Sequence, residues 1–251
     1  MENLEFKNIL NKIDISLSEK QYEQFDKYFE ILVEWNKFMN LTGITQYNDV
    51  MIKHFADSII LKKAIDDINK EAGKDIVNID LNSNIKIIDV GTGAGFPGLP
   101  LKIAFENTEM VLLDSLNKRV KFLNEVIDLL GITGINAIHS RAEDAAKNVD
   151  YREQFDLSVS RAVANLSTLV EYCLPFVKTG GYFIAYKSGD IDDECNNSRN
   201  AINILGGKLV KIHRFRLPET DIDRSFVVIQ KIKNTSKKYP RKSGLPGKEP
   251  L

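Results

Sequence analysis

The sequence has few of the residues that build disulfide-bonded or metal-binding proteins. Its 251 residues include two cysteines, Cys173 and Cys195, and three histidines. The cysteines are not arranged as C-x-x-C, so neither a disulfide framework nor a structural zinc site is expected. We therefore predict no metal.

Long apolar runs are also absent from the sequence. No run approaches ~18 residues, the length typical of a membrane-spanning helix. Residues 1–10, MENLEFKNIL, lack the basic and apolar segments of a secretory signal peptide. We expect a cytoplasmic protein with no membrane partner.

The sequence also lacks an excess of positive or negative charge. The 34 Lys and Arg residues and 35 Asp and Glu residues give a formal net charge of −1. Binding to a nucleic acid would therefore need a local basic patch. The length allows one large domain, or one domain with a small extension.

Four of the 15 glycines, in contrast, fall within eight residues of one stretch, IKIIDVGTGAGFPG at residues 85–98. The β-branched run that ends at Val90 is typical of a buried strand. The glycines after it permit positive φ and close approach of the backbone to a ligand, and Pro97 can open a helix. This pattern predicts the first crossover of a nucleotide-binding α/β domain, with its ligand at the carboxyl end of the strand.

Two ligand classes fit this crossover. Residues 93–98 have the G-x-G-x-x-G spacing of NAD-binding loops. Residues 89–95, DVGTGAG, have the acidic residue and G-x-G-x-G of S-adenosylmethionine-dependent methyltransferases. A second predicted strand, 109–115, contains Asp114 where a ribose-binding carboxylate is expected. In the methyltransferase interpretation, Asp89 lies near the methionine amino group of the cofactor.

The chain before the loop is predicted to be helical. Residues 1–62 form the expected helical extension, in which an S-x-x-Q capping box begins at Ser18. His54 and Asp57 are three residues apart and would be neighbours on one helix. They invite a catalytic interpretation, although we favour a role in docking the extension. Residues 63–84 are polar and are expected to form a helix end and a linker.

The chain after the loop discriminates between the two ligand classes. Strands and helices alternate over 85–232, and the short connection between 208–217 and 225–232 makes these two strands an antiparallel hairpin. Five parallel strands closed by a hairpin predict an α/β protein with the Rossmann-like class I methyltransferase fold and a seven-stranded, mostly parallel sheet. A dehydrogenase would normally continue with a further βαβ half.

Eight blocks of the sequence carry a resemblance to one family. They are WNKFMNLT at 35–42, KHFADS at 53–58, DVGTGAGFPGLPLKI at 89–103, LLDSLNKRVKFL at 112–123, SRAE at 140–143, SRAVANL at 160–166, LPFVKTGGYFIAYK at 174–187 and KKYPRKSGLPGKEPL at 237–251. On these blocks the chain resembles the RsmG (GidB) family, bacterial enzymes that methylate a guanine of 16S ribosomal RNA at N(7). The long 63–84 linker and Ser243, where a second proline is usual, depart from the family.

The resemblance implies S-adenosyl-L-methionine as the cofactor and 16S ribosomal RNA, in the small subunit or its assembly intermediates, as the partner. It implies cofactor contacts at Gly91, Phe96, Ala142, Glu143 and Arg161. Together with the motif, the full predicted cofactor set is Asp89, Gly91, Thr92, Gly93, Gly95, Phe96, Asp114, Ser115, Ala142, Glu143 and Arg161. We expect the protein to be a monomer.

The chemistry of the implied acceptor predicts which residue types matter. Guanine N(7) has an in-plane lone pair and no proton, so it can attack the sulfonium methyl without a general base. Positioning and electrostatics must then accelerate the reaction. N(7) and O(6) are adjacent acceptors that suit Arg or Lys donors. We predict Arg161 and Lys187 as the catalytic residues near the base.

The last segment, 233–251, is predicted to be a basic, flexible tail. Its stretch from 237 to 248 has five cations and no acid. We interpret it as a phosphate-binding arm that becomes ordered on RNA. The predicted RNA-binding residues are Arg119, Lys237, Lys238, Arg241 and Lys242.

Three other functions stay open at this stage. The enzyme could methylate another RNA or a protein. It could be an NAD-dependent oxidoreductase, because of the G-x-G-x-x-G spacing. It could also be a cofactor-binding ribosome-assembly factor without catalysis.

Overall fold

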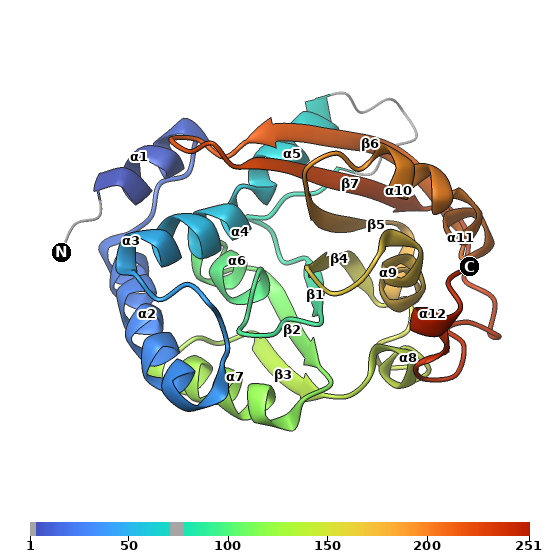
Figure 1. The fold of residues 1–251 in the computed structure, drawn as a ribbon, viewed down its shortest axis with the longest axis horizontal. Coiled ribbons are helices and arrows are strands. Elements are labelled where there is room, and N and C mark those ends of the chain that lie inside the picture. The colour runs from blue at the N-terminus through green and yellow to red at the C-terminus, as the bar shows by residue number, and fades with distance from the viewer. Residues whose placement is uncertain (1–3, 71–77) are drawn as a thin grey trace.

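The computed structural model describes residues 4–70 and 78–251 of the chain, which form a seven-stranded sheet with helices on both faces (Figure 1). The strands are β1 Lys86–Val90, β2 Glu109–Asp114, β3 Ile135–His139, β4 Phe155–Arg161, β5 Val177–Ser188, β6 Gly207–Arg216 and β7 Asp223–Lys231. Their order is β3-β2-β1-β4-β5-β7-β6, in which β1 to β5 run parallel and β7 is antiparallel to β5 and β6. The predicted fold class is confirmed.

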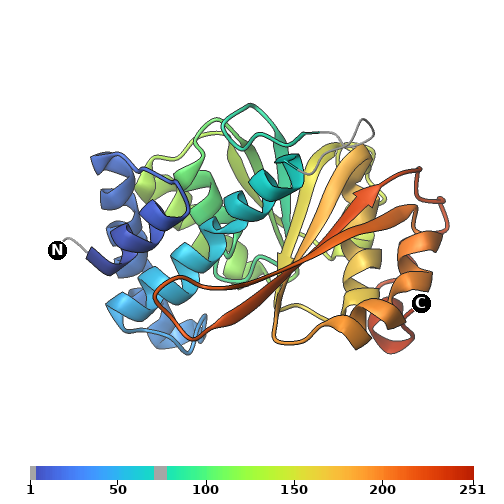
Figure 2. The ribbon, with the colours of Figure 1, turned by 90° about the horizontal axis from the view of Figure 1, so that it is seen from above.

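The helices divide between the two faces of the sheet, as Figure 2 shows from above. The N-terminal elements are α1 Leu4–Lys12, α2 Glu19–Met39, α3 Tyr47–Val50, η1 Met51–Ala56, α4 Asp57–Ile59 and α5 Leu61–Lys70. The remaining elements are α6 Gly98–Ala104, α7 Asn117–Leu130, α8 Ala142–Ala145, α9 Leu166–Cys173, η2 Leu174–Phe176, α10 Asp192–Asn197, α11 Arg199–Ile204 and α12 Leu245–Lys248. Among the described residues, no helix is both long enough and apolar enough to cross a membrane.

The helical extension shares a hydrophobic core with the sheet. Phe25, Tyr28 and Phe55 belong to the same buried cluster as Ile87 of β1. The capping box at Ser18 forms as predicted: its hydroxyl accepts from the N–H of the third helical residue. The burial of aromatic rings against the sheet fixes the extension beside the glycine loop.

The helix end expected within 63–84 is present, and the linker boundary placed at residue 63 is too early. Helix α5 continues to Lys70 because Leu61, Ala64, Ile65 and Ile68 recur at helical spacing and are buried. Residues 71–77, which also belong to this predicted linker, lie outside the described residues.

The prediction of a flexible tail is also wrong, because 233–251 is fixed on the domain. Tyr239 is buried, and Arg152 Nη1 donates to its carbonyl oxygen at 3.0 Å. Arg241 forms an ion pair with Glu171 of α9 at 2.7 Å. In Figure 1 the red C-terminal segment lies beside α8 and α9. A buried carboxylate that needs a counter-charge, together with buried apolar side chains, orders the segment.

Candidate active site

The order of the strands reverses between β1 and β4, and the glycine loop follows β1 at this point. Ligands of open α/β sheets bind at the carboxyl ends of the strands where the order reverses. This edge also receives the ends of β2, β4 and β5, which run parallel to β1. The predicted ligand site therefore lies at the edge of the sheet formed by the carboxyl ends of these strands.

Asp89 at the carboxyl end of β1 holds the glycine loop. Its buried Oδ2 accepts hydrogen bonds from Thr92 Oγ1 at 2.6 Å and from the Gly98 N–H at 2.8 Å. Burial raises the pKa of this carboxyl to about 6, while both hydrogen bonds lower it. Oδ1 has no hydrogen-bond partner among the described residues, so one acceptor remains for a donor group. The contact of Asp89 with a cofactor amino group stays a prediction.

Asp114 at the end of β2 supports the same loop from the neighbouring strand. Its buried carboxylate accepts from the N–H groups of Gly93 at 2.9 Å and Leu116 at 2.8 Å. Arg119 Nη1 lies 3.3 Å from Oδ2 of the same carboxylate. Asp114 therefore orients both the loop and Arg119, and its contact with ribose hydroxyls stays a prediction.

Two cavities lie at this edge of the sheet and share Gly91. Their volumes are about 700 Å³ and about 360 Å³. Of the predicted site residues, the larger cavity is lined by Gly91, Thr92, Gly93, Phe96, Arg119, Arg161 and Lys187. The smaller cavity is lined by Gly91, Ser115, Ala142 and Glu143. Predicted site residues from separate stretches of the sequence thus lie together at this edge of the sheet.

Two of the loop glycines have a positive φ, and one of them is also closely packed. Gly91 has φ +73°, and an added Cβ would lie 2.6 Å from Cγ2 of Val163. Gly93 has φ +62°, and the nearest atom to an added Cβ is the Gly91 carbonyl oxygen, at 4.0 Å. Gly93 therefore presents open backbone toward the larger cavity.

Three predicted cofactor-binding residues line neither cavity: Asp89, Gly95 and Asp114. The two carboxylates act on the loop backbone, as described above. A Cβ at Gly95 would lie 2.5 Å from Cδ1 of Leu99. Gly95 thus permits close packing of the loop on α6. The G-x-G-x-G pattern alone does not distinguish a packing glycine from one that contacts the ligand.

A buried carboxylate joins two guanidinium groups at the larger cavity. Asp57 is 2% exposed, and its oxygens accept from Arg161 Nη1 at 2.9 Å and from Arg224 Nε at 2.7 Å. The Arg161 guanidinium also lies over the ring of Phe96, 5.1 Å from its centroid. Two cations around one anion leave a net positive charge, which suits acceptor atoms or phosphates of a ligand.

Arg224 is a residue of this cavity that the sequence analysis missed. It lies at the start of β7 and is opposite Ser188 in the antiparallel pair with β5. Because β7 runs against β5, its first residues lie at the ligand edge, where the parallel strands end. The predicted hairpin could have indicated Arg224, since an antiparallel strand brings its N-terminal residues to that edge.

His54 connects the helical extension to the glycine loop. Its ring stacks on Phe96 with a centroid distance of 4.5 Å, and Nε2 lies 2.7 Å from Thr42 Oγ1. Burial, with the positive charge of Arg161, lowers the pKa of His54 to about 4. The imidazole is therefore neutral and weakly basic near pH 7. Its contacts agree with the favoured docking role, which stays a prediction. His54 is in η1, a π-helical turn of the type often found at functional sites.

Lys187 near the end of β5 contacts protein groups. Its Nζ donates to the carbonyl oxygen of Ala164 at 2.9 Å and to Oε1 of Glu194 at 2.7 Å. These bonds hold the loop after β4 against α10. Its predicted catalytic contact with a base stays a prediction, and Glu194 offsets much of its positive charge.

The predicted RNA-binding cations do not form one group. Arg119 lines the larger cavity. Lys237, Lys238 and Lys242 are exposed on the C-terminal segment, whereas Arg241 is bound to Glu171. The interpretation of the segment as one free basic arm therefore does not describe Arg241.

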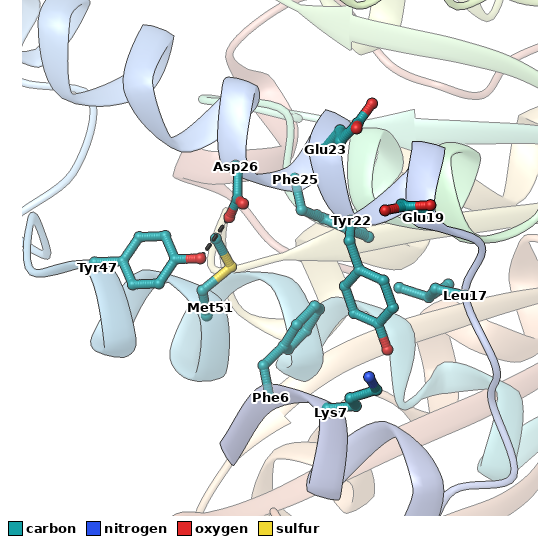
Figure 3. A pocket seen from close by; sticks show the side chains of 10 residues that line it. All are labelled: Phe6, Lys7, Leu17, Glu19, Tyr22, Glu23, Phe25, Asp26, Tyr47 and Met51. Carbon is teal, nitrogen blue, oxygen red and sulfur yellow. Dashed lines mark hydrogen bonds between the residues drawn. The ribbon is translucent and has the colours of Figure 1, made fainter. Parts of the chain in front are cut away.

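A third cavity lies in the helical extension (Figure 3). Its volume is about 420 Å³, and it is lined by Phe6, Lys7, Leu17, Glu19, Tyr22, Glu23, Phe25, Asp26, Tyr47 and Met51. Figure 3 shows the Tyr47 hydroxyl directed at Asp26, to which it donates a hydrogen bond. None of the predicted site residues lines this cavity. Within 4–70 and 78–251, no group of three His, Cys, Asp or Glu residues is placed to hold a metal ion.

The fold and the site define a class of protein: α/β enzymes with a glycine loop at the reversal point of a seven-stranded sheet. A solved structure of an MtNAS mutant in complex with S-adenosylmethionine has a similar fold. It has a TM-score of 0.54 and 14% sequence identity, and the match covers 86% of this chain and 73% of that one.

The family within this class follows from sequence comparison. The family model described as rRNA small subunit methyltransferase G matches residues 21–225. The chain is 47% identical over 250 residues to ribosomal RNA small subunit methyltransferase G of Lachnoclostridium phytofermentans, covering 100% of this chain and 98% of that protein. It is 49% identical over 237 residues to the protein of that name from Acetivibrio thermocellus, covering 94% and 91%. The chain belongs to the rRNA small subunit methyltransferase G family.

Proposed function

We propose that the protein is an S-adenosylmethionine-dependent methyltransferase that methylates guanine N(7) in 16S ribosomal RNA. One observation carries the proposal: a single cavity joins the glycine loop to the guanidinium groups of Arg161 and Arg224. A cofactor on the loop would face donors that suit a guanine edge. Family membership supports ribosomal RNA as the substrate class.

The residues around Gly91 fit this cofactor. The smaller cavity has apolar walls from Val90, Leu113 and Val163, as an adenine ring requires. The open backbone at Gly93 leaves room for the rest of the molecule in the larger cavity. When bound, the cofactor supplies a methyl group made electrophilic by a cationic sulfur.

The protein groups act by position and charge. N(7) of guanine needs no deprotonation, and neither candidate base is well suited to remove a proton, because His54 has a lowered pKa and Asp57 is engaged by two arginines. Arg161 and Arg224 are the proposed donors to the guanine edge. Asp57 fixes both guanidinium groups, so that they are oriented before the base arrives.

The remaining assignments are proposals about the setting of the reaction. We propose that the enzyme acts as a monomer in the cytoplasm, on the small subunit or its assembly intermediates. Arg119 and the exposed Lys237, Lys238 and Lys242 are the proposed phosphate contacts. These cations lie at two places, the larger cavity and the C-terminal segment, which the net charge of −1 does not reveal.

Methyl-group transfer tests the proposal directly. Small ribosomal subunits, naked ribosomal RNA and total protein from cells that lack this enzyme are incubated with labelled S-adenosylmethionine, and the labelled position is mapped. Label on a guanine N(7) of 16S RNA is the expected result. Label on another RNA or on protein would favour the alternative methyltransferases. No label, with binding of NAD, would favour the oxidoreductase.

The location of the cofactor is tested at Gly93. Gly93→Val should abolish binding of S-adenosylhomocysteine, because a β-branched side chain opposes φ +62° and enters the larger cavity. Gly131→Val is the matched control, since Gly131 has φ +60°, an added Cβ there meets nothing within 4 Å, and the residue lines neither cavity. Normal cofactor binding by folded Gly93→Val would place the ligand elsewhere.

A further inference from the structure

We infer that the C-terminal segment 237–251 is a wall of the cofactor site, with Gly247 at the adenine cavity and Arg241 as the positioning residue that anchors it. The inference rests on the proposed cofactor location. It replaces the sequence-based interpretation of the segment as a free RNA-binding arm. Three sets of contacts carry it.

The first set anchors the segment to α9. Glu171 is fully buried, and its oxygens accept from the Arg241 backbone N–H at 2.7 Å, from Nε at 2.9 Å and from Nη2 at 2.7 Å. This is a two-pronged ion pair of the strong, oriented kind. Removing the arginine would leave a buried charge without its partner. The positive charge of Arg241 therefore balances Glu171 within the protein.

The second set connects the segment to α8, where a cofactor contact is expected. The Gly244 N–H donates to Oε1 of Glu143 at 2.7 Å. Ser243 Oγ donates to Oδ2 of Asp144 at 2.9 Å. Glu143 is 3% exposed and lines the smaller cavity. The C-terminal segment therefore orients the side chain that the family resemblance assigns to the cofactor.

The third set forms the cavity wall itself. Gly247 of α12 lines the smaller cavity together with Thr168 and Tyr172 of α9. Thr168 Oγ1 donates to the carbonyl oxygen of Pro246 at 3.0 Å, which holds α12 beside the cavity. A Cβ at Gly247 would lie 3.6 Å from Tyr172 Oη, an ordinary contact. A side chain at 247 can therefore be accommodated near Tyr172, at the expense of cavity space.

Affinity for S-adenosylhomocysteine, measured by calorimetry on the full-length protein, tests the inference. Gly247→Leu keeps every anchoring bond and should weaken binding about tenfold or more, because it narrows the cavity. Arg241→Ala should weaken binding by a similar factor through loss of the anchor. Lys248→Leu and Lys248→Ala are matched controls: Lys248 is exposed and next to Gly247, and both should bind as the wild type does.

Two further readouts separate a positioning role from a purely structural one. The melting temperature of each cofactor-free variant is measured beside its affinity, and Arg241→Lys, which keeps the charge without the two-pronged geometry, should bind with intermediate affinity. A lower melting temperature with unchanged affinity in Arg241→Ala, or normal affinity in Gly247→Leu, would overturn the inference. If Gly93→Val abolishes binding while Gly247→Leu binds normally, the proposed cofactor location is supported and only the inference about the C-terminal segment is rejected. No binding by the wild type would overturn both.

Discussion

At the scale of single residues, the larger cavity depends on one buried carboxylate. Asp57 divides its two oxygens between Arg161 and Arg224. Either arginine can be removed while the other still partners the carboxylate. The arginines can therefore be tested singly without leaving a bare buried charge.

Arg224→Ala should slow methyl transfer while leaving cofactor affinity near the wild-type value. A good guanidinium contact to a guanine edge contributes roughly 1–3 kcal/mol, which corresponds to a fold-change of about 5 to 150 in single-turnover rate. Arg216→Ala, an exposed arginine on the same hairpin paired with Asp223, is the control. An unchanged rate in Arg224→Ala would remove this residue from the proposed base site.

The low pKa of His54 predicts how stability depends on pH. It is about 4 in the folded protein, against an ordinary value of 6.5. Between these values the unfolded chain binds the extra proton, so the free energy of unfolding falls as pH drops through this window. The stability advantage of the wild type over His54→Gln should therefore shrink from pH 7 toward about 4.5 in urea titrations.

Asp89 acts in the opposite direction, because its pKa is raised to about 6. The folded state then binds the extra proton, and the stability from this group is lost as pH rises through about 6. This contribution is present in both proteins and cancels in the difference between them. A wild-type advantage that stays constant or grows on acidification would show that His54 is not a buried, neutral group.

At the scale of elements, helix α2 holds the extension against the crossover that contains the glycine loop. Gln21 Nε2 donates to the carbonyl oxygen of Ile103 at 2.7 Å, and its Oε1 accepts from the Ser18 N–H at 2.8 Å. One side chain thus completes the capping box and binds the end region of α6. This double use is not visible in the S-x-x-Q pattern alone.

Gln21→Ala should lower the free energy of unfolding by roughly 1–3 kcal/mol, because it leaves a buried carbonyl and a cap N–H without their partner. Glu23→Ala, on an exposed position of the same helix, should change it by less than about 0.5 kcal/mol. Denaturant titration of the three proteins measures both values. Equal midpoints for Gln21→Ala and the wild type would show that this contact does not hold the extension.

Local sequence patterns predicted most helices and strands. The two features that were not predicted, the fixed C-terminal segment and the position of Arg224, depend on residues far away in the sequence. The strand, glycine loop and helix at 85–105 follow from residues that are adjacent in sequence. The fixed C-terminal segment depends on Glu171, which is 70 positions before Arg241. Without that partner in view, a stretch rich in lysine, glycine and proline indicates disorder. Arg224 was missed for a related reason: its place depends on the direction of a whole strand.

At the scale of the whole molecule, three distant parts of the chain meet at the carboxyl edge of the sheet. The extension contributes His54 and Asp57, the terminal hairpin contributes Arg224, and the C-terminal segment contributes Gly247. The central claim is that this assembly transfers a methyl group to guanine N(7) by orientation and charge, without a general base.

The most direct test is the pH dependence of single-turnover methylation of small ribosomal subunits, with saturating S-adenosylmethionine and mapping of the modified base. From about pH 7 to 9, above the titration of Asp89, we predict a nearly constant rate and methyl on guanine N(7), for the wild type and for His54→Gln. A large loss of rate in His54→Gln across this range, or a sigmoidal rise that disappears in that variant, would identify a catalytic base and contradict the account.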